Sequence, residues 1–207
     1  TTLTISATPV DHALIPDEGA TNVAGIAIVG SDMYCVKTTG LKTTLLKTTD
    51  YMATKATAVK KDLNWFALGL TKIGNYLYML AEDHKGYGGS TTIVKLDTKG
   101  NQLGTYSINE ICPKGALGIT AADGTNEKFI IMHYADKSNA GTLTFSVVDW
   151  KAAKAASTFT VTNSGFGYTT QLQDIYYHTS FGLFILTNNT FSTLQNRILV
   201  VDLSLIH

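Results

Sequence analysis

The stretch Gly69–Ile108, GLTKIGNYLYMLAEDHKGYGGSTTIVKLDTKGNQLGTYSI, reads as four short strands in succession. Aromatic and aliphatic residues crowd into Tyr76–Ala81, as they do in a pleated, buried strand. A Gly-rich gap precedes Thr91–Asp97, and a short polar turn separates that run from Gly104–Ile108. The stretch therefore predicts a four-stranded antiparallel meander, which cannot bury both of its faces alone.

The same pattern recurs four times along the chain. Each repeat opens on an inner strand with one anchor residue, and the four anchors are Gly25, Gly69, Gly118 and Asp174, at intervals of 44, 49 and 56 residues. The second strands align without gaps, as SDMYCVKTT, NYLYMLAED, KFIIMHYAD and FGLFILTNN. The third strands of three repeats end on an acidic residue in register, at Asp97, Asp149 and Asp202. Such self-similarity predicts repeated units that bury their faces against each other.

The two chain ends complement each other in this pattern. The fourth repeat lacks an outer strand, whereas the chain opens with Thr2–Ser6, TLTIS, which is short, Thr-rich and β-branched like the other outer strands. The sequence thus predicts an all-β, four-bladed β-propeller of four-stranded antiparallel sheets, closed by the N-terminal strand that completes the last blade. We expect a single domain over residues 1–207, with blades at about 23–62, 63–112, 113–165 and 166–207 plus 1–6.

Composition excludes some classes of function. The net charge is zero and Arg197 is the only arginine, which argues against a nucleic-acid footprint. The sequence contains no run of eighteen apolar residues, so no membrane span is predicted. The protein could be secreted or cytoplasmic. Cys35 and Cys112 match no metal spacing, so two unpaired thiols, one of them in the core, are favoured over a disulfide.

Two segments have an ambiguous secondary structure. Ala53–Lys61, ATKATAVKK, fits an outer strand or a short helix, and its neighbours favour the strand. Lys151–Ser157, KAAKAAS, is most simply a helical turn between strands.

Candidate ligand residues lie mainly in the loops of one face, where propellers commonly bind. Asp83, Asp136 and Asn189 occupy matching places in three second-to-third-strand loops, and turn-forming side chains are favoured over a ring of ligand contacts. Phe166 and Tyr168 form either an exposed aromatic platform or packing under their loop, and Trp65 favours packing between blades. The full predicted ligand set is Asp83, His84, Tyr87, Asp136, Asn139, Asn189, Phe166, Tyr168 and Trp65.

A central channel offers a second kind of site. The four inner strands would aim carbonyls near the anchors Gly25, Gly69, Gly118 and Asp174 at the axis, and Asp174 would add a charge. Hard cations take such oxygen ligands, so calcium or sodium is expected there on equal terms with ordered water. No other cofactor is predicted.

Motifs for catalysis are absent from the sequence. No serine lies in a GxSxG elbow, and the sequence holds no HExxH, CxxC or phosphate loop. His133 sits within FIIMHY and is expected to be a semi-buried histidine whose hydrogen bonds are satisfied. The protein is accordingly predicted to be non-catalytic, with an enzyme built from loops of several blades as a remaining alternative.

The repeats resemble β-propeller proteins over essentially the whole chain. The blade number resembles hemopexin-like domains, through Asp174 and the aromatic run Tyr76–Tyr78, and the short blades with Gly- and Asn-rich loops look like tachylectin-type and fungal propeller lectins. This resemblance implies non-catalytic recognition, most simply a lectin that binds a glycan or glycoprotein. A protein-interaction scaffold is the alternative, and either could form a homo-oligomer.

Overall fold

The computed structural model describes residues 21–49, 56–83, 90–122, 126–133, 142–150, 154–162, 171–180, 182–188 and 197–201. Every regular element in these ranges is a β-strand, which confirms the all-β class. No helix in the same ranges has the length and apolar character needed to cross a membrane.

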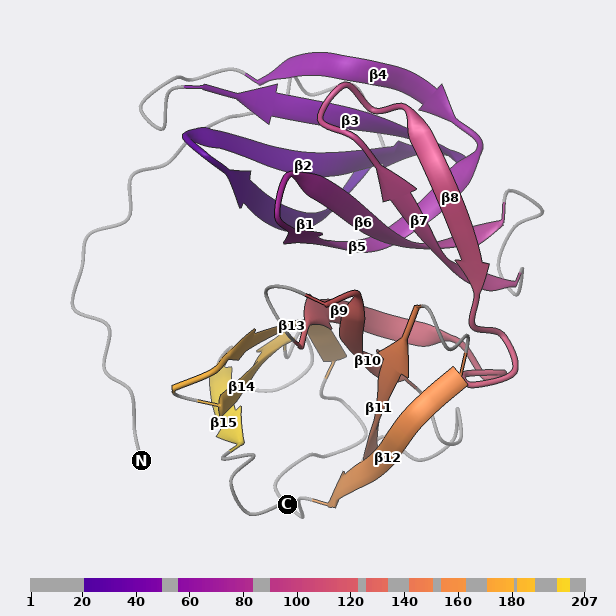
Figure 1. Cartoon of the computed structure of the whole chain (residues 1–207), viewed down its shortest axis with the longest axis vertical. Helices are drawn as coiled ribbons and strands as arrows, with labels where there is room; N and C mark the ends of the chain where they lie inside the picture. The colour runs from indigo at the N-terminus through magenta and orange to yellow at the C-terminus, as the bar shows by residue number, and fades with distance from the viewer. Residues whose placement is uncertain are drawn as a thin grey trace.

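The strands form antiparallel sheets, and each sheet is built from strands that follow one another in the chain (Figure 1). The first sheet contains β1 (Thr21–Val29), β2 (Asp32–Thr39), β3 (Lys42–Thr48) and β4 (Thr57–Leu63). The second contains β5 (Trp65–Ile73), β6 (Tyr76–Asp83), β7 (Thr91–Leu96) and β8 (Gln102–Ser107). The third contains β9 (Ala116–Ala121), β10 (Lys128–His133), β11 (Thr142–Asp149) and β12 (Lys154–Thr162). The fourth, within the described residues, contains β13 (Gln171–His178), β14 (Gly182–Asn188) and β15 (Arg197–Val201).

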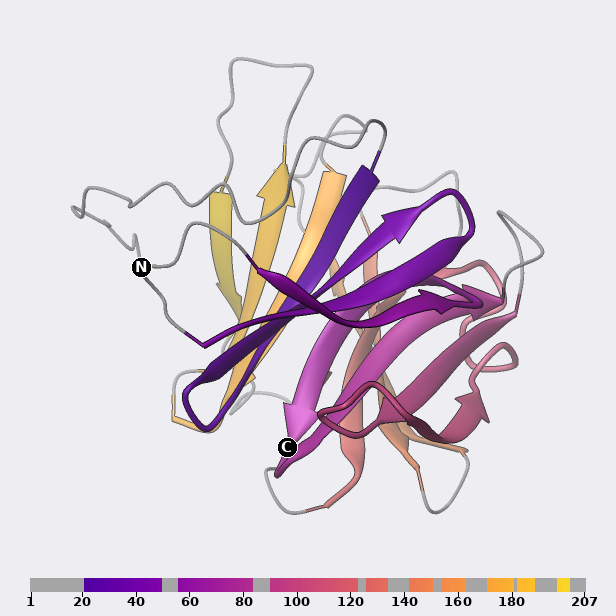
Figure 2. The same ribbon diagram turned by 90° about the horizontal axis from the view of Figure 1, so that it is seen from above.

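These sheets are the blades of a four-bladed β-propeller. The inner strands contact one another in chain order, β1 with β5, β5 with β9 and β9 with β13. Figure 2 shows from above that neighbouring sheets are twisted relative to each other. The predicted closing strand, residues 1–6, lies outside the described residues, so the closure and the blade limits that depend on it stay predictions.

The core consists of layers between successive blades rather than one central mass. Side chains on β6 alternate, so that Leu77 and Met79 pack toward the first blade while Tyr78 and Leu80 pack toward the third. Side chains on β10 alternate in the same way. Phe129 packs in the layer between the second and third blades, and Ile130 packs in the layer between the third and fourth blades. Second strands are therefore buried on both faces, which explains their nearly continuous apolar runs.

A polar cluster lies in the layer between the second and third blades. The Tyr78 hydroxyl donates a 2.8 Å hydrogen bond to Glu127 Oε1, and Lys95 Nζ lies 2.5 Å from the same oxygen. The Lys95 ammonium also lies 4.4 Å from the centroid of the Tyr76 ring. Since Tyr78 is buried, this cluster satisfies its hydroxyl and links the two blades.

Three local predictions have clear outcomes. The first blade's outer element is a strand, as favoured, although it spans Thr57–Leu63 rather than Ala53–Lys61. The helical turn predicted over Lys151–Ser157 is wrong for its described part, because Lys154–Thr162 is strand β12 and pairs with β11. Here the ladder hydrogen bonds to β11 outweigh the helix propensity of alanine. Cys35 and Cys112 are both free, as expected, and both are buried, although only one core thiol was predicted.

The ungapped alignment of the second strands is wrong by one residue in the third blade. In the second blade the anchor Gly69 pairs with Leu80, the sixth residue of its aligned string, whereas Gly118 pairs with Met132, the fifth residue of its string. A strand buried on both faces has no period-two pattern, so its apolar letters do not fix its register.

Candidate functional site

The four inner strands line a cavity of about 750 Å³. Its described walls come from β1, β5, β9 and β13, so every blade contributes to it. The volume falls within the range of roughly 300–1,000 Å³ that is usual for small-molecule sites. We call this space the axial cavity.

Close contacts between inner strands shape the axial cavity at the anchor positions. Gly25 has a positive φ of 70°, and a Cβ on it would overlap the backbone nitrogen of Leu70 and lie 2.6 Å from Leu70 Cβ. A Cβ on Gly69 would lie 3.3 Å from Ile119 Cγ2, and one on Gly118 would lie 3.4 Å from Ile175 Cγ1. Small anchors in the first three repeats thus let each inner strand approach the next one.

Two threonines join successive inner strands at equivalent positions. Thr71, two residues after its anchor, accepts a 3.1 Å hydrogen bond from the Ala121 amide of the next blade. Thr120, two residues after the following anchor, accepts a 2.9 Å hydrogen bond from the Tyr177 amide. The repeat therefore favours a small anchor and, two residues after it, a threonine or another small residue. Ala27 occupies this second position in the first blade.

The fourth repeat departs from this rule at both positions. Asp174 replaces the glycine anchor, and Tyr176 stands where the second and third repeats have threonine. Both residues line the axial cavity, and the Tyr176 side chain is 61% exposed. Strand β1 contributes Ile26 and Ile28 to the lining of the same cavity, and both side chains are exposed. Departures from a repeated pattern are expected at functional or strained positions, so the axial cavity is the candidate functional site.

Asp174 is the one acidic residue among the described residues that line the axial cavity. Burial raises the pKa of its carboxyl to about 6, although the 2.8 Å hydrogen bond from the Ile175 amide to Oδ1 acts in the opposite direction. A carboxyl with such a pKa is populated in both protonation states near pH 6. It can therefore accept hydrogen bonds or donate a proton to a ligand in the cavity.

The predicted ligand residues lie largely outside the described residues, namely His84, Tyr87, Asp136, Asn139, Asn189, Phe166 and Tyr168. Of the other two, Asp83 ends β6 and is half-buried. Trp65 begins β5, where its indole nitrogen donates a 3.1 Å hydrogen bond to Gln102 Oε1 and the ring packs on the core of the first two blades. Neither residue lines the axial cavity, and the loop-based ligand set stays a prediction.

The predicted cation site has two of its four anchors, Gly25 and Asp174, in the lining of the axial cavity. Gly69 and Gly118 do not line the cavity, although all three glycine anchors lie against the next inner strand. Within the part of the chain that the structure describes, no three His, Cys, Asp or Glu side chains gather into a metal-binding group. A calcium or sodium ion held by the anchor carbonyls is untested by this geometry and stays a prediction.

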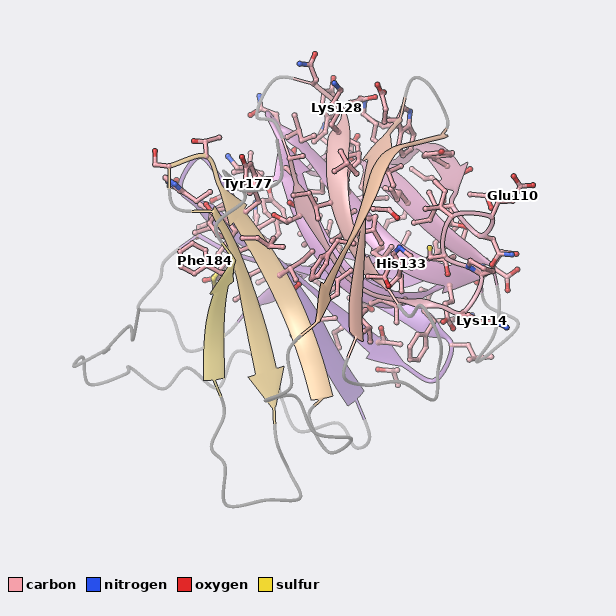
Figure 3. All side chains as sticks on the ribbon, turned by 90° about the horizontal axis from the view of Figure 1, so that it is seen from below. Glu110, Lys114, Lys128, His133, Tyr177 and Phe184 are labelled. Carbon is pink, nitrogen blue, oxygen red and sulfur yellow. The ribbon has the colours of Figure 1, made fainter. Side chains whose placement is uncertain are left out.

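His133 has a hydrogen-bond partner, as expected from the sequence, but it is buried rather than semi-buried. Its Nε2 lies 2.8 Å from Ser146 Oγ, and both side chains are buried inside the third blade. Figure 3 labels His133 in this blade, and Tyr177 and Phe184 in the fourth. The His133–Ser146 pair is thus a satisfied internal contact of the sheet.

Sequence reasoning missed Tyr176, Ile26 and Ile28 as lining residues. The sequence contains a signal for Tyr176, because an alignment of the four inner strands places it at the same position as Ala27, Thr71 and Thr120. No comparable signal marked the two isoleucines, since apolar residues in a strand are usually buried. Only the arrangement of the blades shows that they are exposed to the cavity.

Comparison with known proteins shows the fold. No protein-family model and no curated protein matches the chain. Among solved structures, the Bacteroides ovatus xyloglucan PUL protein GH43B is similar, with a TM-score of 0.63 and 15% identity over 93% of this chain and 39% of that chain. Hydrazine synthase of Kuenenia stuttgartiensis has a TM-score of 0.53 and 11% identity over 87% of this chain and 51% of its own. Glutaminyl cyclase of Myxococcus xanthus has a TM-score of 0.51 and 11% identity, with coverages of 89% and 76%.

These similarities support the β-propeller class, and at such identities they show the fold alone. This chain spans 39% of the length of GH43B. The finer resemblances to hemopexin-like domains and to propeller lectins stay predictions.

The prediction that the protein is not an enzyme is wrong as an exclusion. The similar solved structures include a GH43 glycoside hydrolase, so the β-propeller class to which this chain is similar contains enzymes. The motif search tested only residues close in sequence, and the alternative kept beside it, an enzyme built from loops of several blades, remains open.

Proposed function

We propose that this protein is a carbohydrate-active β-propeller that binds a saccharide in the axial cavity, with Asp174 as the polar group that contacts and protonates it. The observation that carries the proposal is the Asp174 carboxyl itself, because it lines the cavity and burial raises its pKa to about 6. The similarity of the fold to GH43B supports a carbohydrate ligand.

The residues beside Asp174 suit a sugar. Tyr176 offers an exposed ring on which the apolar face of a pyranose can lie, and its hydroxyl can exchange hydrogen bonds with sugar hydroxyls. Lys72, on β5, is the one lysine among the described lining residues and adds a hydrogen-bond donor. Few polar groups on a mainly apolar wall are typical of small-molecule sites.

Asp174 in its protonated form could give its proton to a glycosidic oxygen while the bond from that oxygen to the anomeric carbon breaks and the aglycone leaves as an alcohol. A water oxygen then bonds to the anomeric carbon, and the proton that this water releases restores the Asp174 carboxyl. A raised pKa near the working pH is the usual property of such a general acid. Hydrolysis generally takes a second carboxyl group as well, and the described lining contains only Asp174. Activity measurements therefore separate a hydrolase from a binding protein.

The test combines binding and activity on one panel of xylo-, cello-, arabino- and xyloglucan-oligosaccharides. Isothermal titration calorimetry measures affinity, and release of reducing ends measures hydrolysis. We expect Asp174→Asn to weaken binding at least tenfold or to abolish hydrolysis. The comparison variant is Asp83→Asn, which changes a carboxyl that lies outside the axial cavity and belongs to the alternative, loop-based ligand set.

Two results would contradict the proposal. Loss of binding in Asp83→Asn with normal binding in Asp174→Asn would favour the loop-based lectin predicted from the sequence. No saccharide binding by the unchanged protein, together with tight capture of a protein partner, would favour the interaction scaffold.

A further inference from the structure

We propose that the saccharide bound in the axial cavity carries an apolar substituent, such as an alkyl or aryl aglycone, seated against the β1 wall. This inference rests on the proposed function and names the class of its ligand. The β1 wall is defined as Val23, Ile26 and Ile28, which all line the cavity that contains Asp174.

The exposure of Ile26 is unusual for its place in the repeat. Ile26 directly follows its anchor, as Leu70, Ile119 and Ile175 follow theirs. The preceding blade covers those three side chains, which are 3%, 1% and 5% exposed, whereas Ile26 is 62% exposed. The same strand also exposes Val23 and Ile28. An uncovered apolar row inside a cavity points to an apolar ligand group.

The chemistry of the wall distinguishes it from the rest of the site. Asp174, Tyr176 and Lys72 offer groups that hydrogen-bond to sugar hydroxyls, whereas the β1 wall consists of aliphatic side chains alone. Hydroxyls that lie against such a wall would lose water without gaining partners, which weakens binding. A ligand with a sugar at one end and a hydrocarbon group at the other satisfies both parts of the cavity.

The expected gain in affinity follows from the burial of methylene groups. Each methylene that leaves water tightens binding by up to about fourfold. Only part of an alkyl chain fits beside the sugar, so we expect an octyl glycoside to bind at least tenfold more tightly than the methyl glycoside of the same sugar.

The test uses calorimetry with methyl and octyl β-D-glucopyranoside and β-D-xylopyranoside, below the micelle concentration of each detergent, and with 1-octanol as the chain without a sugar. The variant Ile26→Ser removes the centre of the β1 wall. Leu103→Ser is the matched control, because Leu103 is 50% exposed on the outer strand β8 and does not line the axial cavity. Urea midpoints establish that both variants are folded.

The outcomes separate this inference from the proposed function. A tenfold gain for the octyl glycoside that Ile26→Ser removes and Leu103→Ser keeps supports both. Equal affinity for methyl and octyl glycosides overturns the apolar substituent and leaves saccharide binding intact. This result is also expected if a second copy of the chain covers the β1 wall. If 1-octanol binds as tightly as the octyl glycosides, the wall is supported and the saccharide is overturned. No binding of any probe overturns both.

Discussion

Replacing Gly25 by alanine should disrupt the contact between the first two inner strands. The substitution has two costs, because Gly25 has a φ of 70° and because the new Cβ would overlap the Leu70 backbone. The conformational cost of a left-handed alanine is about 1–2 kcal/mol. Pushing β1 away from β5 adds about 1–3 kcal/mol, as overpacking usually does.

Gly30 isolates the second cost. Its φ is 62°, close to that of Gly25, yet a Cβ on Gly30 would meet no atom within 4 Å. Gly30→Ala therefore bears the conformational cost alone. Both substitutions also restrict the unfolded chain equally, so that effect cancels in the comparison. We expect Gly25→Ala to lower the free energy of unfolding by about 1–3 kcal/mol more than Gly30→Ala does.

Urea denaturation followed by tryptophan fluorescence measures the difference, since Trp65 and Trp150 lie in different blades. The slopes of free energy against urea must agree among the three proteins, so that the comparison reports the native state. Equal losses of stability in the two variants would show that β1 and β5 do not approach each other closely at Gly25. That result would refute the use of small anchors as the basis of blade packing.

Three further substitutions test the other contacts. Thr120→Val should lower the free energy of unfolding by about 1–3 kcal/mol, because the Tyr177 amide loses its acceptor; the exposed Thr105→Val is the control, and urea denaturation measures both. Tyr78→Phe should lower the free energy of unfolding by about 1–2 kcal/mol, because the hydrogen bond from the Tyr78 hydroxyl to Glu127 is lost. An unchanged urea midpoint would show that this hydrogen bond does not stabilise the fold. Burial raises the pKa of Asp174 from 3.8 to about 6, so the folded protein binds its proton more tightly than the unfolded chain, and stability should fall as pH rises from about 4 to above 6. Asp174→Asn should flatten this part of the pH profile and be more stable at pH 7, by an amount on the order of 1–3 kcal/mol, and thermal unfolding across pH checks the sign.

The sequence predicts the propeller well because its information lies in a repeated pattern. The strands of Gly69–Ile108 have strong turn signals, and their spacing recurs in every blade. Prediction fails where tertiary contacts decide the local structure. The alanines of β12 favour a helix in isolation, but pairing with β11 makes them a strand. The register of β10 fails for a related reason, since both of its faces are buried.

The site was predictable in part. Asp174 stood out in the sequence as the only non-glycine anchor, and the structure places it in the axial cavity, as expected for a group near the axis. The role predicted for it, a charge beside a cation held by the anchor carbonyls, stays a prediction, because contacts at the glycine Cα atoms do not test where the carbonyls point. The exposure of Ile26 depends on which blade faces β1, and no local pattern contains that information.

The stability of the fold alone does not explain Asp174. In the three other repeats a glycine anchor lets the next inner strand approach closely, and in two of them a threonine then bonds to that strand. Asp174 instead places a carboxyl where burial raises its pKa, which makes its ionised form unfavourable at neutral pH. Tyr176, two residues further on, leaves a large ring exposed in the same cavity. Two departures from the repeat, both unfavourable for packing and both beside one cavity, are explained together if that cavity binds a ligand.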